Sequence, residues 1–142
     1  MHKELIFQIN SHRESDSEEL VISRLGMQSI PYAVYLEGQV GAGKTFFCKQ
    51  IARLYGIDSL ASSSFLNYSI YCGSFKVVHV DYYYNKHPVE FFYNNIYDDI
   101  DEKTIVLTEW SPVYFELEIP QFLLKIDLLD MKRRKISFYS IG

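Results

Sequence analysis

Residues 38–45 have the sequence GQVGAGKT, which matches the phosphate-binding pattern G-x-x-x-x-G-K-[ST]. Glycines in such a turn let backbone N–H groups surround a phosphate without side-chain clashes. A helix that follows the turn directs its N-terminal N–H groups and its positive dipole end at the same anion. Lys44 would bridge the β- and γ-phosphates, and the Thr45 hydroxyl would coordinate Mg²⁺. The pattern predicts that this chain binds ATP, or a close relative, together with Mg²⁺.

Two acidic residues stand where they could complete such a site. Asp81 follows the apolar run VVHV at residues 77–80, and Glu109 follows IVLT at residues 105–108. In open α/β sheets, ligands bind beyond the carboxyl ends of the strands, where both carboxylates would lie. Either acid could hold Mg²⁺ or orient a water molecule, and either could instead cap a loop.

The elements that would position these residues follow from the hydrophobic pattern. Alternating or continuous apolar runs predict strands at residues 5–9, 32–37, 65–71, 75–80, 105–107, 122–129 and 135–140. Helical spacing predicts helices at residues 15–26, 44–55 and 88–97, the first with a capping box formed by Ser15 and Glu18. The expected fold is α/β and P-loop NTPase-like, with a mixed, mainly parallel sheet flanked by helices. We expect a single P-loop ATPase domain over residues 1–142.

Composition limits the classes of partner. A net charge of −4 and a pI near 5.5 provide no general positive field for nucleic acid, so any RNA contact would run through a partner. The basic run KRRK at residues 132–135 is predicted to be a solvated turn. Cys48 and Cys72 match no metal-ligand spacing and are predicted to be reduced packing residues. With a polar start and no long apolar run, the chain is expected to be cytoplasmic, without a membrane segment.

Four segments together resemble one family. The sequences LEGQVGAGKT at 36–45, SSSF at 62–65, HVDYY at 79–83 and LTEW at 107–110 have the order and spacing of the TsaE (YjeE) family. The resemblance extends from about residue 17 to residue 136. The members of this family are small bacterial P-loop ATPases needed for threonylcarbamoyladenosine modification of tRNA. The resemblance therefore implies an accessory ATPase whose partner is a complex of the TsaD and TsaB type, which it resets between turnovers and which handles the tRNA.

The resemblance also implies roles for single residues. Thr45 and Glu109 would be the Mg²⁺ ligands, and Asp81 would be a second acidic residue needed for hydrolysis, so that Glu109, Asp81 and Lys44 form the catalytic set. Trp110 would lie near the nucleotide, with a buried structural tryptophan as the alternative. The implied set of residues that bind ATP or ADP is Ser17, Val40, Gly41, Ala42, Gly43, Lys44, Thr45, Trp110 and Arg134.

Two of these assignments have a second interpretation. Ser17 corresponds to a hydroxyl residue that helps to bind nucleotide, or it belongs only to the start of a helix. Arg134 corresponds to an arginine of the last hairpin, although Arg133 could be the equivalent residue.

The chain also departs from the family pattern. Gln39 replaces an acidic residue, Ser63 a proline, Tyr84 an arginine and Asn95 a glycine. These changes bear on the hydrolysis rate and on partner contacts more than on nucleotide binding. Two other functions therefore stay open: a small-molecule P-loop kinase, and a nucleotide-binding module without turnover. A kinase lid would be rich in arginine, whereas residues 82–108 contain none. The preference for ATP over GTP and the oligomeric state stay open as well.

Overall fold

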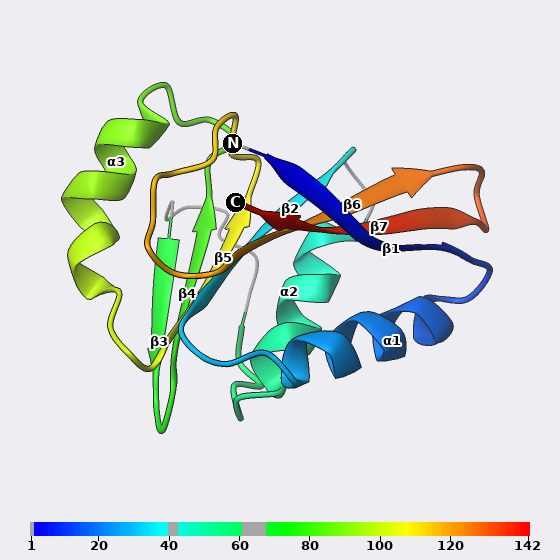
Figure 1. Cartoon of the computed structure of the whole chain (residues 1–142), viewed down its shortest axis with the longest axis horizontal. Coiled ribbons are helices and arrows are strands. Elements are labelled where there is room, and N and C mark those ends of the chain that lie inside the picture. The colour runs from blue at the N-terminus through cyan, green and yellow to red at the C-terminus, as the bar shows by residue number, and fades with distance from the viewer. Residues whose placement is uncertain (1, 40–42, 61–67) are drawn as a thin grey trace.

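A seven-stranded sheet forms the centre of the computed structural model, which describes residues 2–39, 43–60 and 68–142 but not the side chains of residues 14–18 and 20. The strand order is β1-β7-β6-β2-β5-β4-β3 (Figure 1). The strands are β1 (Lys3–Ser11), β2 (Tyr32–Gly38), β3 (Tyr68–Cys72), β4 (Lys76–Asp81), β5 (Thr104–Glu109), β6 (Gln121–Leu128) and β7 (Arg134–Ile141). The helices are α1 (Glu14–Gly26), α2 (Lys44–Arg53), α3 (Pro88–Asn95) and the short 3-10 helix η1 (Tyr97–Asp99).

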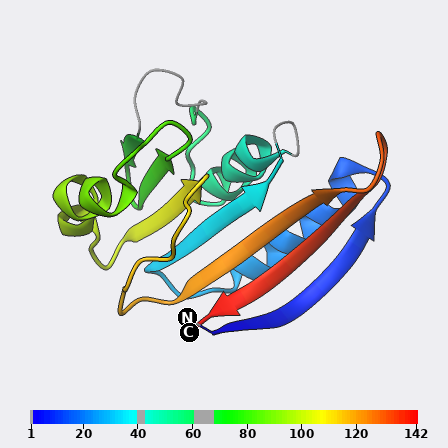
Figure 2. The same cartoon turned by 90° about the horizontal axis from the view of Figure 1, so that it is seen from above.

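Four neighbouring strands, β6, β2, β5 and β4, run parallel, and antiparallel pairs complete both edges of the sheet. The predicted mixed, mainly parallel sheet flanked by helices is therefore confirmed. Because parallel strands end at the same edge, the carboxyl ends of β2, β4 and β5 lie together (Figure 2). This edge is where the sequence places its glycine-rich turn and its two acidic residues.

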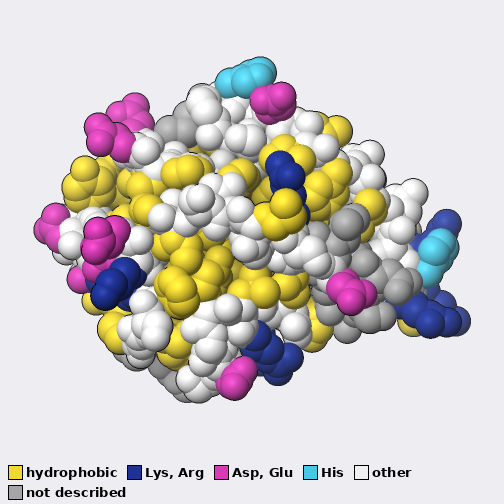
Figure 3. Space-filling view, turned by 60° about the horizontal axis from the view of Figure 1, so that its bottom comes forward, with side chains coloured by type: hydrophobic (Ala, Val, Ile, Leu, Met, Phe, Trp, Pro, Cys, Tyr) yellow, Lys and Arg dark blue, Asp and Glu magenta, His cyan; other side chains and the backbone are white. Residues whose placement is uncertain are grey.

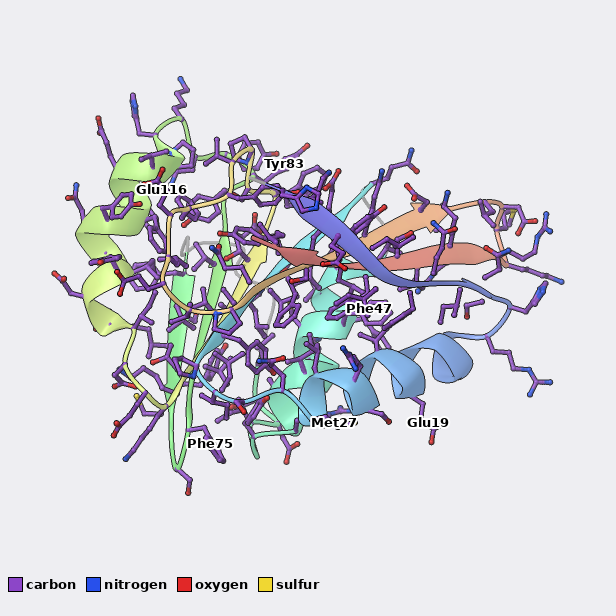
Figure 4. The ribbon with its side chains drawn as sticks, in the orientation of Figure 1. Glu19, Met27, Phe47, Phe75, Tyr83 and Glu116 are labelled. Carbon is purple, nitrogen blue, oxygen red and sulfur yellow. The ribbon has the colours of Figure 1, made fainter. Side chains whose placement is uncertain are left out.

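Side chains of β2 alternate between two apolar clusters, one on each face of the sheet. Tyr32, Val34 and Leu36 belong to the cluster that α1 and α2 cover. Ala33 and Tyr35 belong to the cluster that contains Phe92 of α3. In Figure 4 the side chain of Phe47 extends from α2 into the first cluster, where it is buried. Burial on both faces fixes the central strands and hence the positions of the residues at their ends.

The helices differ from the predicted ones in three details. Helix α1 begins at Glu14 after Arg13, which provides no side-chain cap, so Ser15 lies inside the helix and the predicted capping box is wrong. Helix α2 ends at Arg53, two residues before the predicted end, and Gly56 follows with a φ of 77°. Helix α3 ends at Asn95 and is followed by η1 instead of continuing to residue 97.

The start of the helix predicted at 88–97 is confirmed, since Pro88 is the first residue of α3, where its missing N–H costs nothing. The first residues of the strand predicted at 65–71 lie outside the described residues. Among the residues that the structure describes, no helix is long and apolar enough to cross a membrane.

Candidate nucleotide-binding site

The glycine-rich turn connects the carboxyl end of β2 with the N-terminus of α2. Gly43 is the N-cap of α2 and has a φ of 104°, a conformation that residues with a side chain rarely adopt. A Cβ atom at Gly43 would also lie 2.9 Å from Nη1 of Arg134. The backbone therefore requires glycine here, and a larger residue would also displace the end of the flexible Arg134 side chain. Val40, Gly41 and Ala42, which we predict to bind phosphate, lie outside the described residues.

Arg134 is the arginine that the fold brings to this turn. It is the first residue of β7, and its guanidinium lies beside Gly43. Arg133 instead pairs with Asp130 in the preceding turn, with 2.7 Å between Nε and Oδ2. The prediction of a solvated turn at 132–135 is right for the exposed Lys132 and Arg133. It is wrong for Arg134 and Lys135, which are half-buried in β7.

Lys44 is almost fully buried and is held against the turn. Its Nζ donates hydrogen bonds to the carbonyl oxygens of Gly38, at 2.6 Å, and Gln39, at 2.8 Å. The same Nζ lies 4.1 Å from the centre of the Trp110 ring, a cation–π contact. Burial lowers the pKa of Lys44, and the carboxylates of Glu109 and Asp81 oppose this change. The ammonium group therefore stands between the turn and the two predicted acidic residues.

The two predicted Mg²⁺ ligands are in direct contact. Thr45 Oγ1 donates to Glu109 Oε1 at 3.1 Å, and the Glu109 side chain is only 3% exposed. The contact forms because α2 packs over β5, whose last residue is Glu109. A hydroxyl and a carboxylate oxygen are hard ligands that suit Mg²⁺, so the residues present fit this ion.

Asp81 lies next to Glu109, since these residues are paired in the parallel register of β4 and β5. Burial raises the pKa of Asp81. The backbone N–H of Tyr83 donates a hydrogen bond to Oδ1 at 2.9 Å and lowers this pKa, whereas the negative charge of Glu109 raises it. The structure thus brings Lys44, Thr45, Asp81 and Glu109 together at one edge of the sheet.

Two further side chains contact Glu109, and we did not predict them from the sequence. His79, fully buried on β4, lies with Nε2 2.5 Å from Glu109 Oε2. Cys48, fully buried on α2, lies with Sγ 3.8 Å from the same oxygen. Their possible ligand atoms and that of Glu109 lie within 4.8 Å of one another. Burial, together with Glu109, raises the pKa of the Cys48 thiol, so the thiol stays protonated and donates to the carboxylate.

Spacing contained a signal for both residues. His79 precedes Asp81 by two positions, which is the repeat of one strand face, and Cys48 follows Thr45 by three, which is one helix face. The two cysteines are free; Cys48 is a packing residue as predicted, whereas Cys72 is exposed.

Trp110 stands at the mouth of the site and not in the core. It is half-buried, has a φ of 61°, and contacts Tyr83 edge-on, with ring centres 4.7 Å apart. A left-handed backbone at a residue other than glycine is strained, and such strain is common at functional sites. Tyr83, which is labelled in Figure 4, lies in the turn after β4.

Comparison with known proteins identifies the family of this chain. The family model described as "Threonylcarbamoyl adenosine biosynthesis protein TsaE" matches residues 11–136. The chain belongs to the TsaE family. Two similar proteins are named "tRNA threonylcarbamoyladenosine biosynthesis protein TsaE". The one from Rickettsia conorii is 31% identical over 129 residues, which cover 87% of this chain and 73% of that protein. The one from Rickettsia typhi is 32% identical over 108 residues, which cover 73% of this chain and 74% of that protein.

A solved structure has the same fold. The crystal structure of Bacillus subtilis YdiB matches with a TM-score of 0.70 and covers 100% of this chain and 89% of that chain. At 20% identity this similarity concerns the fold alone. The predicted family resemblance is confirmed by the family model and the curated relatives.

The residues of this chain that depart from the TsaE-family pattern lie in different parts of the structure. Tyr84 is 88% exposed in the turn after β4. Asn95 is exposed at the end of α3, where its side chain donates to the carbonyl oxygen of Phe91. Gln39 accepts from Lys44 through its backbone oxygen, so its changed side chain does not alter that contact. Residues 62–64 and the side chain of Ser17 lie outside the part that the structure describes.

A cavity of about 520 Å³ opens beside Lys44 in this TsaE-family chain. Residues of both charges and several aromatic rings line it, among them Lys3, Glu37, Lys44, Trp110 and Tyr114. The cavity therefore borders the glycine-rich turn and gives a small molecule or a partner side chain access to it.

Proposed function

We propose that this TsaE-family chain binds ATP and ADP with Mg²⁺ and hydrolyses ATP slowly, as an accessory subunit of the tRNA threonylcarbamoyladenosine modification machinery. The single observation that carries the proposal is the contact between Thr45 and Glu109 directly beside the glycine-rich turn. A chance glycine-rich turn has no reason to bury a carboxylate next to the hydroxyl that follows its lysine.

Each residue of the site has a defined task in this proposal. Lys44 and Arg134 place positive charge beside the phosphates, and the N-terminus of α2 adds its backbone N–H groups. Thr45 and Glu109 hold Mg²⁺, which neutralises charge on the β- and γ-phosphate oxygens. Asp81, next to Glu109, is placed to orient water or a ligand of the metal ion.

The scarcity of cations at the site explains why turnover would be slow. Lys44 and Arg134 are the cations that the described structure places beside the turn, and Tyr84 replaces the arginine that commonly follows this motif in the family. An additional arginine supplied by another protein raises phosphoryl-transfer rates roughly 10³-fold or more in other P-loop proteins. We therefore propose a TsaD–TsaB-type complex as the partner that completes the site.

Contact with tRNA is proposed to be indirect. The chain has a net charge of −4, and on the face shown in Figure 3 the Lys and Arg side chains form separate groups and no continuous basic surface. Phosphate backbones bind to continuous basic surfaces, so the partner complex would hold the tRNA. The protein would act in the cytoplasm, where that complex modifies tRNA.

A small-molecule kinase is the second candidate, and the cavity beside Lys44 favours it, because a kinase needs an acceptor pocket next to the γ-phosphate. However, residues 82–108 have no arginine and only Lys86 and Lys103 as lysines, whereas a kinase lid needs several cations. A nucleotide-binding module without turnover is the third candidate, and absence of hydrolysis under all conditions would support it.

Nucleotide binding tests the first part of the proposal. Calorimetric titration with ATP and with ADP, each with Mg²⁺ and with a chelator, should show binding that Mg²⁺ strengthens. Thr45→Ala should remove most of this Mg²⁺ effect, while Thr104→Ala, which changes a threonine at the opposite end of β5, should not. Wild-type protein that binds neither nucleotide would contradict the proposal.

A further inference from the structure

His79 has one polar contact in the described part of the chain, and that contact is with Glu109. The imidazole is 0% exposed, its Nε2 lies 2.5 Å from Glu109 Oε2, and its Nδ1 has no hydrogen-bond partner among the described residues. An ionised carboxylate only accepts hydrogen bonds, so Nε2–H is the donor. The ring cannot touch solvent or a nucleotide, and any effect on chemistry must pass through Glu109.

Packing alone does not account for this histidine. A buried imidazole with an unsatisfied Nδ1 pays a desolvation cost that an apolar side chain of similar size would avoid. Its buried neighbours on the same strand are Val77, Val78 and Val80, so the other buried positions of β4 are apolar. The Nε2 atom of His79 therefore serves its hydrogen bond with Glu109, not the packing of the core.

The carboxylate of Glu109 is held from two sides. Thr45, on α2, donates to Oε1 at 3.1 Å and lies 3.4 Å from Oε2, whereas His79, on β4, makes the short hydrogen bond to Oε2, which the Cys48 thiol contacts only at 3.8 Å. Two donors on opposite oxygens fix the rotation of the carboxylate group, which one donor could not do. We propose that His79 is the positioning residue that orients Glu109, so that the oxygen nearest Thr45 is presented to the metal ion of a bound nucleotide. This inference rests on the proposed function of Glu109 as a Mg²⁺ ligand.

The chain offers variants that separate hydrogen bonding from packing. Gln places its amide nitrogen as many bonds from Cβ as Nε2 of histidine, so His79→Gln can still donate to Glu109. Asn is one methylene shorter and His79→Leu is apolar, so neither can donate to that oxygen. Val78→Ala is the matched control for packing, because Val78 is the preceding residue of β4, equally buried, and faces the opposite side of the sheet.

Mn²⁺ serves as the probe, since its binding to the ADP complex can be followed by electron paramagnetic resonance. In His79→Leu and His79→Asn, Mn²⁺ affinity in the ADP complex should fall about tenfold or more, the effect of losing one hydrogen bond to a charged group. Affinity for metal-free ADP should not change. His79→Gln should recover most of the loss, and Val78→Ala should bind Mn²⁺ like the wild type. If His79→Leu does not fold, the comparison of His79→Asn with His79→Gln decides the same point.

The possible failures are distinguishable. Wild-type Mn²⁺ affinity in folded His79→Leu and His79→Asn would overturn the role of His79 and leave the nucleotide site intact. Equal losses in His79→Asn, His79→Gln and Val78→Ala would show that His79 only packs, which also overturns the inference. Wild-type protein that binds no Mn²⁺ with ADP would overturn both the inference and the proposed function.

Discussion

At the scale of single residues, the site is a short set of contacts around two charged groups. Lys44 contacts the turn and Trp110, and Glu109 accepts hydrogen bonds from Thr45, Cys48 and His79. The sequence pattern predicts Lys44, Thr45, Asp81 and Glu109 as site residues, because the lysine and the threonine stand at fixed positions of the glycine-rich motif and the two acids stand at strand ends. The contact between His79 and Glu109 depends on how β4 and β5 are aligned, which a single sequence does not specify.

Lys44→Ala should weaken binding of Mg²⁺–ATP by about 2–3 kcal/mol, or roughly 30- to 150-fold, because charge-assisted hydrogen bonds to the phosphates are lost. Calorimetric titration measures the change. Lys49→Ala is the control, since Lys49 is an exposed lysine on the same helix. If both variants bind ATP equally well, Lys44 does not contact the phosphates.

Glu109→Gln should keep most of the nucleotide affinity and lose most of the hydrolysis. The amide preserves shape but removes the negative charge that positions Mg²⁺ or the attacking water. Single-turnover hydrolysis of bound ATP is the measurement, and Glu116→Gln, at the exposed residue labelled in Figure 4, is the control. Turnover at the wild-type rate in Glu109→Gln would make Asp81 the leading catalytic acid.

At the scale of elements, the site depends on how strands and helices meet at their ends. The apolar run at residues 105–107 predicts a strand covered on both faces, and β5 is buried at every position. Glu109 could therefore be predicted at the end of a central strand. The approach of Arg134 to Gly43 could not be predicted in this way. It requires β6 to pair with β2 so that the start of β7 lies near Gly43, and strand order is a property of the whole sheet.

Gly43→Ala should reduce Mg²⁺–ATP binding at least tenfold and lower the thermal stability, because a side chain is strained at a φ of 104° and would meet Arg134. Calorimetry and thermal unfolding test both effects. Gly26→Ala is the control, since no atom lies within 4 Å of the added Cβ and its φ is not positive. Normal binding by Gly43→Ala would mean that the turn can shift without loss of the site.

Asp101, in the turn before β5, should make the stability of the folded chain depend on pH in the acidic range. Hydrogen bonds from Lys76, first, and then from Lys103 and Thr104 lower the pKa of Asp101 from its ordinary value of 3.8 to about 2. A depressed carboxyl pKa stabilises the folded state above the unfolded pKa, and this stability is lost as the pH falls from about 4 toward 2.

Asp101→Asn should therefore reduce the stability near neutral pH and flatten the change between pH 4 and 2, measured by urea unfolding at each pH. Asp98→Asn is the control, since the exposed Asp98 lies in η1, outside this turn. An unchanged slope in Asp101→Asn would show that the ion pair with Lys76 does not contribute.

At the scale of the whole molecule, one sheet brings the described residues of the proposed phosphate site to one edge. The Arg134 guanidinium, the buried Lys44 and the Thr45–Glu109 pair come from β7, α2 and β5, which only the complete sheet brings together. The cavity beside Lys44 and the exposed Tyr84 leave that edge accessible to a partner. Nucleotide state and partner affinity should be coupled in both directions, because coupling of binding free energies is reciprocal.

The most direct test of this account is the rate of ATP hydrolysis with and without a TsaD–TsaB complex from the same organism. We expect very slow turnover by the isolated chain, a clear rise when the complex is added, and no rise when the chain carries Glu109→Gln. The same low rate with and without the complex, or phosphate transfer to a small molecule instead of water, would contradict the account.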